Sequence, residues 1–235
     1  MVRKLMNLSG GSWRDWISVI KPRILAENLF CAFAGGCLAS GWQFEYASLI
    51  FMLAGTALVI AAASMMNNFL DRFRDLKMER TKNRPLPGGR LKAGYVLSAG
   101  IGTALLGLVI LYFFVSPLSM MLGFIGLLVY VVIYTAWLKP ASTWSTSVGG
   151  ISGSMPPMIG YCSFSHELDL GAWLLFFLLF LWRPPHFWAL GILKKEEYRA
   201  AGYPLLPPSS KACAGQKFKC CPMSPLCLSL IISYL

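Results

Sequence analysis

Side chains that carry oxygen atoms recur at every fourth residue in one short polar segment of the chain. Asn67, Asp71 and Asp75 are each four positions apart, and residues four apart lie on the same face of an α-helix. Oxygen ligands suit hard cations such as Mg²⁺, which is typically held by one or two carboxylates together with substrate phosphates. The spacing therefore predicts a Mg²⁺ site along one face of a helix.

Basic side chains follow this acidic stripe directly. Cationic donors form strong charge-assisted hydrogen bonds with phosphate oxygens. The residues that we expect to hold phosphate in this way are Lys77, Arg80, Lys82 and Arg84. Carboxylates that can hold a metal ion, next to cations that can hold phosphate, indicate a diphosphate site. The alternative is a solvated loop whose acids and bases pair with one another, and spacing alone does not decide between the two.

The polar segment lies between long apolar runs. The chain of 235 residues is 56% hydrophobic and 13% charged, and its mean hydropathy is +0.59. A helix needs about 20 apolar residues to cross the hydrocarbon core of a bilayer, and no barrel-like alternation is present. We therefore predict an all-α, polytopic transmembrane helical bundle. Its predicted spans are about 24–42, 47–69, 94–115, 118–138, 146–164 and 170–192.

Basic residues are distributed unevenly along the chain. The net charge is +11, yet the connections near 43–46, 116–117 and 165–169 contain no Lys or Arg. Because Lys and Arg are enriched in cytoplasmic loops, the pattern predicts a cytoplasmic N-terminus. The basicity then reflects contact with the lipid bilayer, and we expect no nucleic-acid partner. The N-terminal arm lacks the features of an organelle transit peptide, which favours a bacterial plasma membrane over the mitochondrial inner membrane.

Four motifs carry a resemblance to a known family. The segment "NNFLDRFRDLKMERTKNRPLPGG" resembles the first aspartate-rich motif, N-x-x-x-D-x-x-x-D, of the UbiA-type intramembrane prenyltransferases. Three further segments resemble those of a narrower group, the protohaem IX farnesyltransferases or haem O synthases. They are "YTAWLKP" (134–140), "VGGISGSMPPMIGY" (148–161) and "WRPPHFWALGILKKEEYRAAGYPLLP" (182–207). The resemblance covers about residues 21–207.

The resemblance implies a UbiA-like bundle with a defined activity. The farnesyl group of farnesyl diphosphate would be transferred to a vinyl group of protohaem IX (haem B) with addition of water, giving haem O and diphosphate. Mg²⁺ on Asn67, Asp71 and Asp75 would assist, and haem B would be a substrate rather than a permanent cofactor. Haem A synthase or terminal oxidase assembly proteins are the implied partners.

Two further sites follow from the same resemblance. His186 lies in an apolar span, where an ionisable side chain is costly and often functional; it could ligate haem iron or accept the final proton. Glu196 and Glu197 stand where the superfamily has a second acidic motif, although a charged helix end explains Glu196 equally well. Arg183 stands where the narrower group usually has Gln.

Other interpretations remain open from the sequence. The chain could prenylate a quinone precursor, act as a membrane transporter, or be an inactive truncated product. The glycine-rich 148–161 segment indicates either an interrupted helix that lines a pocket or close helix packing, or both.

We divide the chain into an N-terminal interfacial arm (1–23), a transmembrane prenyltransferase domain (24–207) and an atypical tail (208–235). The resemblance stops at this tail, whose four cysteines fit no common zinc template. The tail is therefore interpreted as a truncated or unrelated ending.

Overall fold

The computed structural model describes residues 11–79, 81–141 and 145–193, and all of its regular elements over these ranges are helices. Arg80, Glu196, Glu197 and the tail 208–235 lie outside the described residues. The helices are α2 (Trp13–Ile20), α3 (Pro22–Ser40), α4 (Tyr46–Asp75), α5 (Ala93–Phe114), α6 (Pro117–Leu128), η1 (Val129–Leu138), α7 (Lys139–Ala141), α8 (Ser145–Ser165) and α9 (Leu170–Leu193).

The predicted spans correspond to six long helical segments, of which the fourth is α6 continued by η1. Within the described residues, three segments are long and apolar enough to cross a membrane: Tyr46–Asp75, Ala93–Phe114 and Pro117–Leu138. Leu170–Arg183 is a shorter apolar helix. The all-helical membrane fold predicted from hydropathy is therefore confirmed.

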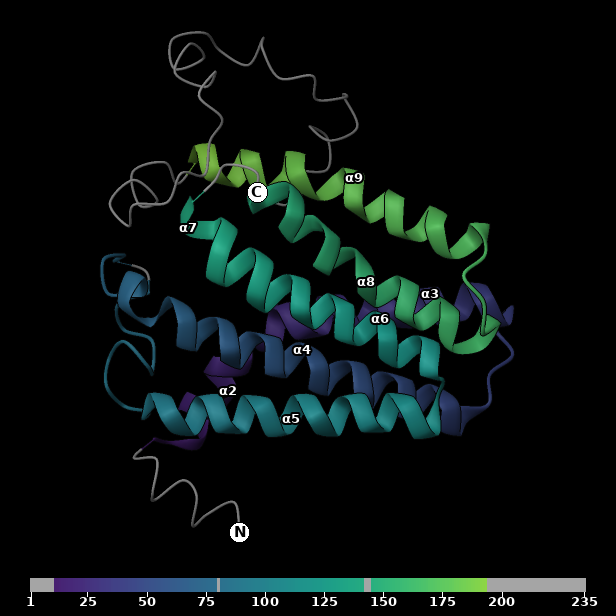
Figure 1. Cartoon of the computed structure of the whole chain (residues 1–235), viewed down its shortest axis with the longest axis horizontal. Coiled ribbons are helices and arrows are strands. Elements are labelled where there is room, and N and C mark those ends of the chain that lie inside the picture. Colours follow the sequence, from purple (N-terminus) through teal and green to yellow (C-terminus); the bar gives the residue numbers. More distant parts are fainter. Residues whose placement is uncertain (1–10, 80, 142–144, 194–235) are drawn as a thin grey trace, which may run out of the picture.

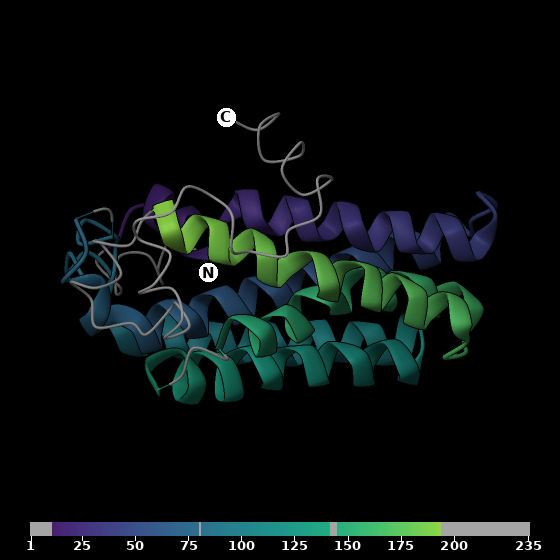
Figure 2. The same cartoon turned by 90° about the horizontal axis from the view of Figure 1, so that it is seen from above.

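The long helices lie side by side with their axes roughly along one direction (Figure 1). α4 packs against α5, α3 packs against α8, and α8 packs against α9. The connection 76–92, α7 and the C-terminal end of α9 all lie at the same end of the bundle (Figures 1 and 2). Two described basic parts of the chain, the connection 76–92 and α7, which begins at Lys139, therefore lie at one end of the fold (Figure 1).

Small residues allow α3 and α8 to approach closely. A Cβ added to Gly160 of α8 would overlap the backbone carbonyl of Ala32 in α3, and one added to Gly35 would overlap the carbonyl of Pro157. α8 is continuous although Pro156 and Pro157 lie inside it, so the expectation of an interruption is wrong. The expectation that this segment lines a pocket is confirmed. The alternative of close packing between helices is confirmed for this segment.

The fourth span changes its helical type part-way along. The α-helical turns of α6 give way to the π-helix η1 over Val129–Leu138. In η1 the Thr135 hydroxyl donates to the carbonyl oxygen of Tyr130, five residues back, at 2.8 Å. π-helical segments are rare and occur frequently at functional sites. Hydropathy gave no indication of this change.

Candidate active site

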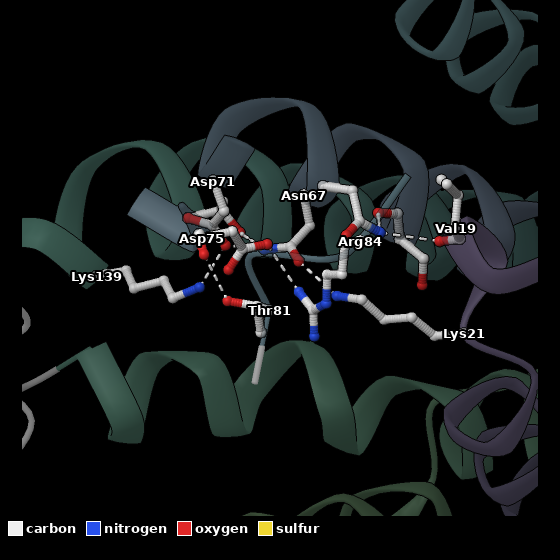
Figure 3. A network of polar contacts seen from close by, with 11 residues as sticks. Val19, Lys21, Asn67, Asp71, Asp75, Thr81, Arg84 and Lys139 are labelled. Carbon is white, nitrogen blue, oxygen red and sulfur yellow. Dashed lines mark hydrogen bonds and ion pairs between the residues drawn. The ribbon is translucent and has the colours of Figure 1, made fainter. Parts of the chain in front are cut away.

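The predicted acidic stripe lies on the last three turns of α4. Asn67, Asp71 and Asp75 are all buried, with at most 5% of their surface exposed. Spacing by four residues places them on one face of this helix, and that face points into the bundle (Figure 3). Buried carboxylates are costly unless they are paired, so the surrounding cations determine what this face can do.

Three cations from three other segments contact the stripe (Figure 3). The Lys139 ammonium, at the start of α7 directly after η1, pairs with the Asp71 carboxylate. The Arg84 guanidinium lies 2.8 Å from the Asp75 carboxylate. The Lys21 ammonium, which precedes α3, donates to the Asn67 amide oxygen at 2.6 Å. Acidic and amide oxygens therefore face cations across a space between helices.

Hydrogen bonds from uncharged donors also hold the stripe in position. The Asn67 amide donates to Asp71 Oδ2 at 3.0 Å and to the Thr135 hydroxyl at 3.2 Å. The Thr81 hydroxyl donates to the backbone carbonyl of Asp75 at 2.9 Å. The contact with Thr135 joins α4 to the π-helical segment, so the geometry of η1 directly affects the position of Asn67.

Lys21 occupies a strained and unfavourable position for a cation. It joins α2 to α3 in the left-handed conformation, with φ of +58°, which costs a non-glycine residue about 1–2 kcal/mol. Burial of the ammonium, and then the nearby cations Arg84 and Lys139, lower its pKa from 10.5 to about 7. Strain of this kind persists where the surrounding structure imposes it, and it gathers at functional sites. An anion bound here would stabilise the protonated form.

A cavity of about 380 Å³ begins at this polar end and extends between α3, α4, α6, η1, α8 and α9. Lys21, Asn67, Asp71, Asp75, Arg84 and Lys139 all contribute to its polar wall. Further along, apolar side chains such as Val59, Ile60, Leu127, Met155 and Ile159 line it. The cavity thus joins a charged end to an apolar interior, which suits a ligand with an anionic head and a hydrocarbon chain.

The predicted phosphate-binding cations separate into two groups. Arg84 lines the cavity. Lys77 is exposed in the turn that follows α4, and Lys82 pairs with Glu79 at 2.6 Å on the surface of the loop. Arg80 lies outside the described residues. Of the described cations in this loop, the structure brings only Arg84 to the acidic stripe.

α9 contributes its own ionisable side chains. His186 stacks on Trp182, with ring centroids 4.8 Å apart. Arg183 lies in the cavity wall. Arg183 and His186 are three positions apart, so both lie on one side of α9.

Sequence reasoning missed two of the three cations that contact the stripe. Lys139 belongs to the "YTAWLKP" segment. The resemblance of this segment to a family motif was the signal in the sequence that could have identified Lys139 as a site residue. Lys21 falls in the predicted interfacial arm (1–23), and its position just before the first span was the available signal for it. Thr135 was missed because nothing in the sequence indicates π-helical geometry.

Proteins with similar sequences carry a common name. Over 201 residues the chain is 46% identical to the protoheme IX farnesyltransferase of Alkalihalophilus pseudofirmus, covering 83% of this chain and 64% of the relative. It is 42% identical to protoheme IX farnesyltransferase 1 of Bacillus subtilis, covering 82% and 62% respectively. The chain thus spans just under two thirds of the length of these two relatives.

Solved structures show the same fold. A digeranylgeranylglyceryl phosphate synthase superposes with a TM-score of 0.71 at 16% identity, over 84% of this chain and 68% of that one. A UbiA homologue from Aeropyrum pernix K1 superposes with a TM-score of 0.62 at 22% identity, over 78% and 68%. The model of the UbiA prenyltransferase family matches residues 28–219. With the helical bundle and its buried acidic stripe, this match shows that the chain is a membrane protein that belongs to the UbiA prenyltransferase family.

Proposed function

We propose that this chain carries the active site of an enzyme that transfers a farnesyl group from farnesyl diphosphate to a vinyl group of protohaem IX, giving haem O and diphosphate. The observation that carries the proposal is the buried stripe of Asn67, Asp71 and Asp75, which faces cations at the polar end of an apolar cavity. The names of the relatives support haem as the acceptor. Membership of a prenyltransferase family and the position of the stripe at a helix end disfavour a transporter.

The donor set at the stripe fits Mg²⁺. Two carboxylates and an amide oxygen project from one helix face, and Mg²⁺ takes one or two carboxylates and completes its shell with water and substrate phosphates. Asn67, Asp71 and Asp75 would hold the ion. Bound there, Mg²⁺ would neutralise the negative charge that develops on a departing diphosphate.

The chain's own cations would bind and orient the diphosphate. Lys21, Arg84 and Lys139 approach the stripe from different segments, so a diphosphate at this end would receive donors from several directions. Such pre-positioned donors stabilise charge as it develops and need little reorganisation. Arg84 and Lys139 would then exchange part of their contact with the carboxylates for contact with phosphate oxygens.

The reaction requires an environment that excludes water until the last step. The bond between farnesyl C1 and the diphosphate oxygen breaks, and diphosphate leaves with the electron pair. The terminal vinyl carbon of haem forms a bond to C1, a water molecule adds to the inner vinyl carbon, and one proton is released. Apolar residues around the cavity, including Val59 and Leu127, would keep water from the allylic cation before it meets the vinyl group.

We expect His186 to ligate haem iron or to accept the released proton.

The proposal has a direct test by mass spectrometry. The full chain, reconstituted in bilayer discs with farnesyl diphosphate, haem B and Mg²⁺, is expected to produce haem that has gained a farnesyl group and a hydroxyl group. Chelation of Mg²⁺ should reduce the yield by about a hundredfold or more, since a metal ion contributes several kcal/mol at such sites. Prenylation of a quinone precursor with no change in haem would transfer the proposal to another acceptor class.

The loop cations provide a second prediction. Arg84→Gln is expected to weaken binding of farnesyl thiodiphosphate, a slowly reacting analogue, by at least about tenfold, because it removes a charge-assisted hydrogen bond. Lys82→Gln removes an equal charge from the same loop, at a residue that pairs with Glu79, and it should change affinity less than about twofold. Isothermal titration of both variants measures the difference. An equal loss in the two variants would instead support the wider set of Lys77, Arg80, Lys82 and Arg84 predicted from the sequence.

Location and partners complete the proposal. The clustering of basic segments at one end of the bundle supports a cytoplasmic N-terminus, and the bacterial relatives support a plasma membrane. Glu196 and Glu197 remain predicted as a second acidic site. Haem A synthase or terminal oxidase assembly proteins are the partners that haem O synthesis would require.

A further inference from the structure

A second cationic position lies in the cavity wall, on α9. The Arg183 guanidinium donates to the Asn28 amide oxygen of α3 at 3.2 Å. It also lies directly over Gly153 of α8, where an added Cβ would overlap the guanidinium. All three residues line the cavity. Three helices therefore meet at this guanidinium, and the absence of a side chain at residue 153 provides the space that it occupies.

Arg183 has no acidic partner among the described residues. No carboxylate in that part of the chain lies within 4.0 Å of it, and its hydrogen bond there is to a neutral amide. Glu27, which precedes Asn28, pairs instead with Arg23 at 3.2 Å on the outer surface of α3. An arginine within an apolar helix is costly and usually faces a cavity or a counter-charge. The cavity is thus the direction from which an anion can reach this guanidinium.

This position is separate from the diphosphate end. The Arg183 guanidinium contacts Asn28, whereas the cations of the diphosphate end contact the stripe on α4. Asn28 lies seven residues after Lys21, which is about 10 Å along α3. The cavity therefore has two cationic regions about two helical turns apart.

We propose that Arg183, held by Asn28 over Gly153, binds a carboxylate of the acceptor substrate. The inference rests on the proposed function and assigns a residue to its second substrate. A guanidinium presents paired N–H donors in a plane, which match the two oxygens of a carboxylate. Protohaem carries two propionate carboxylates on an otherwise apolar macrocycle. A contact at Arg183 would fix the orientation of the ring, and with it the vinyl group presented to the farnesyl carbon.

Porphyrin binding tests the proposal without any need for turnover. Zinc protoporphyrin IX is fluorescent, and its dimethyl ester has the same ring without the two negative charges. The wild-type chain is expected to bind the diacid at least about tenfold more tightly than the diester, as loss of a charge-assisted hydrogen bond implies. Arg183→Gln should weaken binding of the diacid to the level of the diester and leave the diester unchanged.

Two matched variants and a second ligand separate the outcomes. Arg183→Lys should retain part of the preference for the diacid, whereas Arg23→Gln, on the exposed side of α3, should retain all of it. Farnesyl thiodiphosphate should bind Arg183→Gln as tightly as wild type. If this variant loses affinity for the diphosphate analogue and not for the diacid, Arg183 serves the other substrate and the proposal is wrong.

Failure of the proposed function gives a different result. Wild-type chain that binds neither porphyrin would overturn haem as the acceptor, and with it this carboxylate site. Wild-type chain that binds diacid and diester equally would overturn the carboxylate site alone and leave haem as the acceptor.

Discussion

Asp71→Asn is expected to reduce farnesyl transfer by about 10²–10³-fold, the range found when one preorganised charge-stabilising group is removed from an active site. The substitution preserves shape and removes the negative charge that Lys139 and Asn67 contact. Asp75→Asn, which removes the partner of Arg84, should have an effect of similar size. Turnover at saturating substrate measures both, and the Mg²⁺ concentration required for half-maximal rate should rise in each variant.

Glu79→Gln is the matched control for these variants. It changes an acid in the connection that follows α4. Among the described residues this acid pairs only with Lys82, on the surface, and the change should leave turnover within about twofold of wild type. Each variant should be checked for insertion and for a monodisperse profile in detergent. Wild-type turnover in correctly folded Asp71→Asn and Asp75→Asn would remove the basis for a Mg²⁺ site on α4.

Gly160→Ala should lower the free energy of unfolding by about 3 kcal/mol or more, the upper part of the range for overpacking a close contact. The added Cβ would overlap the backbone carbonyl of Ala32, and a backbone atom cannot move aside as the end of a flexible side chain can. α3 and α8 would have to separate, and the cavity between them would change shape. The midpoint of thermal unfolding in detergent, followed by circular dichroism, measures the loss.

Gly102→Ala makes the same chemical change on α5, where no atom lies within 4 Å of the added Cβ. Alanine favours helix over glycine by about 1 kcal/mol, so this variant should be neutral or slightly more stable. Equal midpoints for the two variants would show that α3 and α8 are less tightly packed than the contact at Gly160 indicates.

Local sequence patterns predicted the elements and one face of the site. Six apolar runs predicted six long helical segments because the length of a span is set by bilayer thickness. The spacing of Asn67, Asp71 and Asp75 predicted their common face because helical periodicity is a local property. Both features depend on residues that are close together in the chain.

The partners of that face could not be predicted in the same way. Lys139 meets Asp71 across 68 positions and Lys21 meets Asn67 across 46, so each contact depends on how whole helices pack. Arg84 and Lys82 are two residues apart in one basic loop, and only the fold determines that one faces the cavity and the other faces solvent. The glycines of α8 were ambiguous for the same reason, since their role depends on the helix that lies opposite.

The π-helical segment η1 also restricts how this chain can change during evolution. A π-helical turn closes its hydrogen bond one residue later than an α-helical turn, so the fourth span contains length that a regular helix would not need. Losing a single codon between Pro117 and Tyr134, with the helical winding kept, would rotate all that follows by roughly 100°. Lys139 would then turn away from Asp71, and Thr135 from Asn67. Insertions and deletions should therefore be far rarer along this stretch than hydrophobic substitutions.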